Sequence, residues 1–79
     1  MSVYPNPVTD GEVTVLWGEE LDSRVDKIEL VDLSGRVLQT HQSPREARAT
    51  FSVAGLKRGL YVLRVVRAEG TITRKVLVE

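Results

Sequence analysis

Residues 59–78 read GLYVLRVVRAEGTITRKVLV and hold the most apolar run of the chain, a short turn and a second run rich in β-branched residues. In 60–67 apolar side chains occupy both odd and even positions, which indicates a strand that is buried on both faces. Gly70 is expected to take a positive φ in the turn, because glycine has no Cβ to oppose it. The stretch therefore predicts two antiparallel strands, 60–67 and 71–78, with the first at the centre of a sheet.

A second hairpin is predicted from VDLSGRVL, residues 31–38. Aspartate suits the first position of a type I turn, so a turn that starts at Asp32 would place Gly35 in the left-handed region and form a bulge. The alternative, a two-residue turn, would set Leu30 opposite Gln39 and match both faces of the hairpin poorly. The preferred register pairs Asp32 with Arg36, Leu30 with Leu38 and Ile28 with Thr40. One face of the hairpin is then apolar, with an ion pair at its tip.

The rest of the chain continues as short runs of β-forming residues between turn residues. Strands are predicted at 12–17, 26–32, 36–41 and 48–53. A helical turn within 19–25 is the alternative to a loop there, because Trp17, Leu21 and Val25 recur at near-helical spacing. The spacing of the runs predicts an all-β fold, either a sandwich or a barrel.

The N-terminal segment YPNPVTDG, residues 4–11, is stiff. Each proline lacks a backbone N–H, and the residue before each proline is pushed toward extended conformation. Such a segment cannot be an interior strand, so residues 3–8 are predicted to form a seventh strand on an edge or to lead into the domain. We expect one domain over residues 1–79, with residues 3–11 as an extended, proline-containing lead.

The composition is that of a small globular domain, with 79 residues of which 42% are hydrophobic and 28% charged. The chain has no cysteine, which excludes disulfides and a cysteine-based zinc site. No charged n-region and apolar h-region follow Met1, so an exported protein would carry its signal peptide on a longer parent chain. Met1 and Ser2 would then be additions to the natural domain.

Charge is divided unevenly although the net charge is zero. Residues 1–44 hold three basic and eight acidic residues, whereas residues 45–79 hold eight basic and three acidic ones. Attraction between the two halves is the favoured explanation, and a basic patch for an anionic partner is the alternative. Nucleic acid is not expected as a partner, because the arginines are scattered over strands and aromatic residues are few.

The sequence predicts no enzyme, metal site, cofactor or small-molecule substrate. His41 is the single histidine, and without a cysteine or a G-x-S-x-G stretch we expect it to be an exposed residue at a strand end. Trp17 and Tyr61 are expected in the core rather than on a sugar-stacking platform. Four carboxylates do not match the spacing of an EF-hand loop and are expected to form a solvated acidic loop, namely Glu19, Glu20, Asp22 and Asp26.

Four motifs in their order along the chain, YPNPVTDGEVTV, IELVDLSGRVL, LKRGLYVLRV and RKVLVE, resemble the C-terminal sorting domain of type IX secretion cargo proteins, in its type A form. The resemblance covers the chain from Tyr4 to Glu79, with departures at Val31 and Glu79. The family motifs fall on Pro5, Asn6 and Pro7, on Asp32, Gly35 and Arg36, on Gly59, Tyr61 and Val65, and on the terminal strand Lys75, Val76, Leu77 and Val78.

The resemblance implies an immunoglobulin-like antiparallel β-sandwich of about seven short strands. It implies a non-catalytic address that directs a cargo fused at its N-terminus through the type IX secretion system across the outer membrane, commonly followed by sortase-like removal. The expected partners are the translocon, shuttle and sortase-like components. The expected route runs from the periplasm to the cell surface or the extracellular space. The candidate recognition residues are Arg74, Lys75, Val76, Leu77 and Val78.

Two other functions fit the same fold. One is a passive immunoglobulin-like spacer in a cell-surface enzyme, because a sandwich by itself does not specify a function. The other is a carbohydrate-binding module, for which Trp17 would have to be accessible to a sugar.

Overall fold

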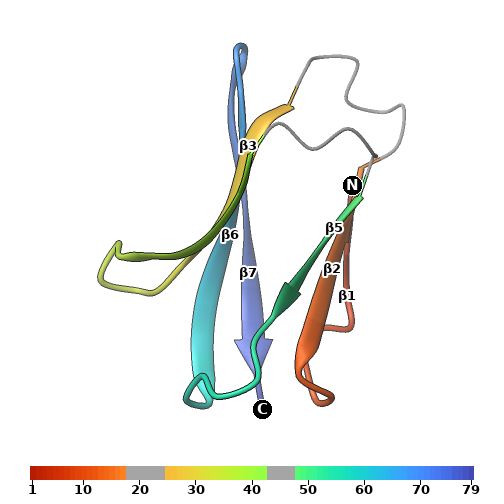
Figure 1. The fold of residues 1–79 in the computed structure, drawn as a ribbon, viewed down its shortest axis with the longest axis vertical. Coiled ribbons are helices and arrows are strands. Elements are labelled where there is room, and N and C mark those ends of the chain that lie inside the picture. The colour runs from red at the N-terminus through yellow and green to blue at the C-terminus, as the bar shows by residue number, and fades with distance from the viewer. Residues whose placement is uncertain (18–24, 43–47) are drawn as a thin grey trace.

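The fold is a sandwich of two antiparallel β-sheets, seen in a computed structural model that describes residues 1–17, 25–42 and 48–79. One sheet has the strand order β1-β2-β5 and the other the order β4-β3-β6-β7. In Figure 1 the larger sheet lies on the left and the smaller one on the right. The strand bounds are β1 Ser2–Tyr4, β2 Glu12–Leu16, β3 Val25–Val31, β4 Val37–Gln42, β5 Arg48–Ser52, β6 Gly59–Arg67 and β7 Gly70–Val78.

The strands confirm the all-β fold and the predicted order of elements. Each strand after the lead begins and ends within one residue of its predicted bounds, and the described residues contain no helix. The apolar strand β6 lies between β3 and β7, and Gly70 in the β6–β7 turn has a φ of 133°, as predicted. The helical alternative within 19–25 falls, apart from Val25 at the start of β3, outside the described residues.

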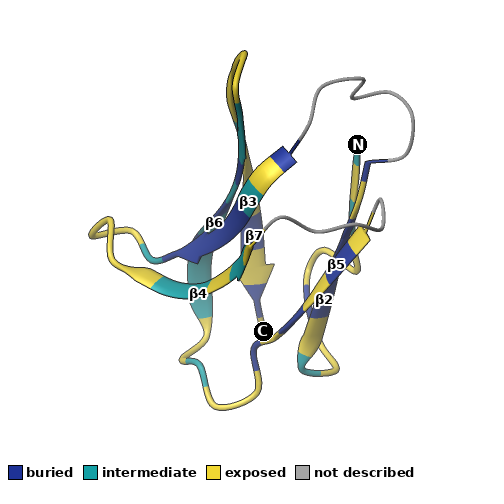
Figure 2. Ribbon diagram, turned by 45° about the horizontal axis from the view of Figure 1, so that its top comes forward, coloured by how far each residue is buried: buried dark blue, intermediate teal, exposed yellow. Residues whose placement is uncertain are grey.

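The core lies between the sheets because alternate residues of each strand point inward. In the smaller sheet Val13 pairs with Phe51 and Val15 with Ala49, and all four are buried. In Figure 2 the buried segments of β2 and β5 face those of the larger sheet. Trp17 and Tyr61 belong to the same core cluster, as predicted, with 6% and 9% of their surface exposed.

The β3–β4 hairpin has the predicted turn but not the predicted register. The Gly35 N–H donates to the Asp32 carbonyl, Gly35 has a φ of 92°, and the Asp32 N–H donates to the Arg36 carbonyl. These contacts confirm the turn that starts at Asp32. Farther along, however, Leu30 pairs with Gln39 and Ile28 with His41, so the predicted pairs of Leu30 with Leu38 and of Ile28 with Thr40 are wrong.

The register changes because β4 contains one extra residue. Val31 pairs with Val37 and Leu30 with Gln39, which leaves Leu38 between two successive pairs. A bulge of this kind bends a strand. Leu38 packs against the core, and the side-chain amide of the next residue, Gln39, donates to the Ser52 carbonyl of β5 in the other sheet. Because of the bulge, the consecutive residues Leu38 and Gln39 both make contacts between the two sheets.

His41 is half-buried on the inward face of β4, so its predicted exposure is wrong. Its ring lies edge-on to Phe51, with the two ring centroids 4.5 Å apart. Phe51 is fully buried. The histidine therefore closes the side of the core between the two sheets.

Candidate functional site: the C-terminal strand and the segment that covers its edge

The candidate recognition residues are divided between three environments by the alternation of β7. Val76 and Val78 point into the core, with exposed fractions of 0% and 5%. Lys75 and Leu77 lie on the outer face of the larger sheet, and both are exposed. Arg74 pairs with the buried Leu63 and so belongs to the inward face, but it is exposed to solvent.

The free edge of the same strand is covered by the proline-containing lead. The Asn6 side chain accepts a hydrogen bond from the Leu77 N–H and donates one to the Lys75 carbonyl, each at 3.1 Å. Val8 then adds backbone bonds in a parallel bridge: its N–H donates to the Leu77 carbonyl at 2.8 Å, and its carbonyl accepts from Glu79 at 2.9 Å. Residues 6–8 therefore act as a short extra strand against residues 75–79.

Pro5 and Pro7 flank this contact and are themselves exposed. The peptide bonds Tyr4–Pro5 and Asn6–Pro7 are both cis. Val8, which directly follows Pro7, has only 1% of its surface exposed and belongs to the core cluster. The sequence prediction included the prolines and Asn6 but missed Val8, although an apolar residue directly after Pro-Asn-Pro was the available signal.

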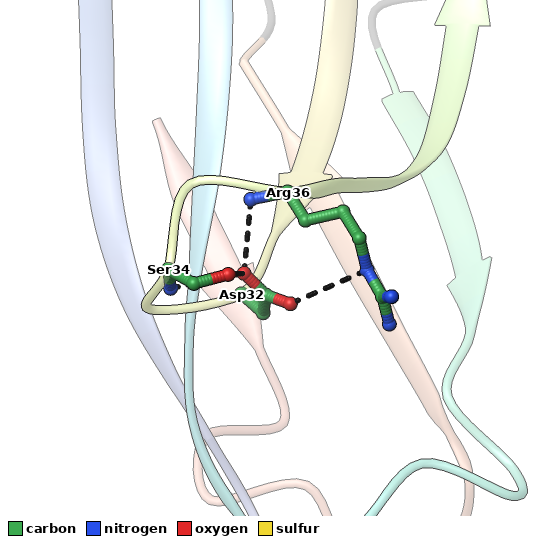
Figure 3. Close-up of polar contacts among 3 residues, drawn as sticks. All are labelled: Asp32, Ser34 and Arg36. Atoms are coloured by element: carbon green, nitrogen blue, oxygen red, sulfur yellow. Dashed lines mark hydrogen bonds and ion pairs between the residues drawn. The ribbon is translucent and has the colours of Figure 1, made fainter.

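The turn motif is held by the Asp32 carboxylate, as Figure 3 shows. One carboxylate oxygen accepts from the Ser34 hydroxyl at 2.6 Å, the Ser34 N–H at 3.0 Å and the Arg36 N–H at 2.9 Å. The other oxygen lies 3.6 Å from Nε of Arg36, the predicted ion pair. The hydrogen bond from the Ser34 hydroxyl and the one from the Arg36 N–H lower the pKa of Asp32.

A shallow cavity of about 330 Å³ brings the turn motif next to the strand motif. Leu38, Leu56 and Tyr61 contribute apolar surface, while Asp32 and Arg36 line it from the turn. The Tyr61 hydroxyl donates to the Lys57 carbonyl at 2.6 Å, so it ties the loop before β6 to the strand. This contact explains why a tyrosine rather than a phenylalanine suits the position.

The remaining motif residues belong to β6. Gly59 begins the strand and pairs with Val78, the last residue of β7. Val65 is fully buried between Ile28 of β3 and Ile72 of β7. The motif residues thus help to hold the lead, the turn and the two last strands in place.

Of the four acidic residues considered as calcium ligands, the structure describes one. Asp26 is exposed in β3, whereas Glu19, Glu20 and Asp22 lie outside the described residues. Within 1–17, 25–42 and 48–79, no three His, Asp or Glu side chains gather as metal ligands would. In that same part of the chain there is no helix with the length and apolarity needed to span a membrane.

Comparison with known proteins gives one family. Residues 2–79 match the family described as "Secretion system C-terminal sorting domain". No curated protein matches the chain. Because the family match covers essentially the whole chain, the chain belongs to the C-terminal sorting domains of type IX secretion.

Proposed function

We propose that the domain is the address of a longer secreted protein. The type IX machinery would recognise the folded sandwich and move an N-terminally attached cargo across the outer membrane, and a sortase-like protease would then remove the domain. Family membership already indicates a type IX sorting signal, a non-catalytic role and export toward the outer membrane. The observation that carries the proposal is the family match over residues 2–79.

The structure supports this proposal through the way in which the sandwich is closed. The terminal residues 75–79 are held by the lead at residues 6–8, which belong to the N-terminal segment that would follow a cargo in the sequence. The lead and the terminal strand thus come together only in the folded state. If the type IX machinery recognises residues of both segments, it would recognise the sorting domain only after the domain has folded.

The removal step would occur before β1. Proteases cut extended backbone that is accessible and not held in a sheet. Ser2, Val3 and Tyr4 already pair with Leu16, Val15 and Thr14 of β2. We therefore expect the C-terminus of the mature, exported cargo to lie upstream of Ser2. Intact-mass measurement of an exported reporter fused to residues 2–79 would locate this C-terminus.

The proposal is tested by fusing residues 2–79 to the C-terminus of a reporter that carries a signal peptide, in a bacterium with a functioning type IX system. The expected result is reporter at the cell surface or in the medium, and reporter confined to the periplasm in a matched strain that lacks the translocon. If the fusion stays in the periplasm of the competent strain while native cargo is exported, the domain is a spacer and not an address.

A further inference from the structure

The terminal segment of β7 leaves a partner only one accessible surface. A strand can be contacted through its inward side chains, its hydrogen-bonding edge or its outward side chains. The inward side chains of Val76 and Val78 are in the core. The edge at residues 75–79 is occupied by Asn6 and Val8. The outward side chains are Lys75 and Leu77.

These two residues continue an apolar band across the outer face of the larger sheet. Leu77 pairs with Leu60, and Lys75 pairs with Val62. Val62 pairs in turn with Val31, which pairs with Val37 of β4. Leu60 and Val62 are half-buried, while Val37 and Leu77 expose 41% and 39% of their surface. The band therefore crosses all four strands, from the edge strand β4 to β7.

Val31 shows that this band is separate from the core. It is only 4% exposed, yet it does not belong to the core cluster that joins the two sheets. Its strand neighbour Leu30 is fully buried inside that cluster, so alternation places Val31 outside. We call the outward residues Val31, Val37, Leu60, Val62, Lys75 and Leu77 the outer band.

The outer face also carries excess positive charge. The Glu29 carboxylate forms ion pairs with two cations. Its Oε1 lies 2.8 Å from a guanidinium nitrogen of Arg64, and its Oε2 lies 3.6 Å from Nζ of Lys27. Lys75 adds a further cation and is paired with no acidic side chain of the described residues. The outward positions of the four strands thus hold three cations, Lys27, Arg64 and Lys75, against the two carboxylates Asp26 and Glu29.

We propose that the outer band is the docking surface of the sorting domain, and that its partner is a protein of the type IX machinery presenting an apolar surface with a carboxylate opposite Lys75. This inference rests on the proposed function. It specifies that, of the five candidate recognition residues 74–78, Lys75 and Leu77 contact the partner. Apolar contact would supply binding free energy, and the carboxylate would supply orientation, since charge complementarity contributes specificity. Val76 and Val78 then contribute by folding, and Arg74 lies outside the contact.

Neighbouring residues provide a matched pair for the test of charge. Lys75→Glu and Arg74→Glu make the same charge reversal one residue apart, on opposite faces of β7. In the reporter fusion to residues 2–79, Lys75→Glu should reduce the exported fraction about tenfold or more, because truncating or reversing a charge in a docked interface is costly. Arg74→Glu should leave export unchanged, and Lys75→Arg should also preserve it because the positive charge remains.

A second pair tests the apolar part of the outer band. Leu77→Gln lies within the band, whereas Leu33→Gln lies at the tip of the β3–β4 turn, where Leu33 is 68% exposed. Leu77→Gln should reduce export by a similar factor, about tenfold, and Leu33→Gln should not. Thermal melting of each purified domain verifies that the variant is folded before its export is compared.

The outcomes separate this inference from the proposed function. Loss of export confined to Lys75→Glu and Leu77→Gln, with folded domains, supports the outer band as the docking surface. Normal export of both variants overturns it while the sorting function stands. Equal loss in Arg74→Glu and Leu33→Gln also overturns it, because the effect would not be specific to one face. Failure of the unmodified fusion to leave the periplasm contradicts the sorting function itself.

Discussion

At the scale of single residues, Asn6 connects segments that are far apart in the sequence. It bonds to Lys75 and Leu77, which lie 69 and 71 positions away in the sequence. An amide side chain has a donor and an acceptor, so it can satisfy the carbonyl and the N–H that an edge strand leaves open. Together with the backbone of Val8, this residue therefore links the start of the chain directly to its end.

Asn6→Ala should remove both hydrogen bonds and reduce the free energy of unfolding by about 1–2 kcal/mol, since each contributes about 0.5–1.5 kcal/mol. The Leu77 amide proton should also exchange with solvent faster, which amide hydrogen exchange by NMR can measure. Asn6→Asp is the matched control, because its carboxylate can still accept from Leu77 but cannot donate to the Lys75 carbonyl. Unchanged exchange at Leu77 in Asn6→Ala would show that the lead does not hold the edge.

Asp32 makes a pH-dependent contribution to stability whose sign is fixed by its lowered pKa. The charged form is stabilised in the folded domain, so the contribution is complete above the ordinary aspartate pKa of about 3.9 and is lost as the pH falls through the lower folded value. Asp32→Asn keeps an oxygen acceptor but not the charge. Its melting temperature should lie below that of the unchanged domain at neutral pH, and the gap should close in acid. A gap that is constant with pH would contradict this assignment.

At the scale of elements, the β3–β4 hairpin shows how far local sequence determines structure. Asp32 and Gly35 specify the turn because the constraints on its first and fourth positions act within a few residues. The bulge at Leu38 was not predictable in this way. It places Gln39 within reach of Ser52 on the other sheet, a contact between residues that are distant in sequence. Tertiary packing therefore decided the register, against the pairing that the hairpin residues alone had predicted.

Gly35→Val should destabilise the hairpin by about 1–2 kcal/mol, because a β-branched side chain is disfavoured at the φ of 92° observed there. A Cβ built on Gly35 meets no atom within 4 Å, so the cost would come from the backbone alone. Gly35→Asn should cost less, since asparagine tolerates the left-handed region. Equal urea midpoints for the valine variant and the unchanged domain would count against the turn conformation.

At the scale of the whole molecule, the sequence predicted the strands well because alternation and turn residues are local signals. The predicted edge strand at 3–8 is divided in the structure: residues 3–4 belong to β1 on the edge of the smaller sheet, and residues 6–8 cover the edge of β7 in the larger sheet. The sequence could not indicate which edge they cover, because the contact of Asn6 with Leu77 exists only in the folded sandwich. The same limit applies to the outer band, whose residues come from four strands.

We infer that the secretion machinery recognises a surface of the folded domain and not the linear sequence of its last strands. Phe51 is a suitable position for the test, because it is fully buried in β5 and lies outside residues 59–79. Phe51→Asp should unfold the sandwich, since an unpaired carboxylate in the core is strongly destabilising, while every residue of β6 and β7 stays unchanged. The measurement is the ratio of exported to periplasmic reporter for the fusion with and without this substitution, at matched periplasmic amounts of intact protein. The unchanged fusion should be exported and the Phe51→Asp fusion retained in the periplasm; equal export of an unfolded Phe51→Asp fusion would show that the linear sequence is sufficient.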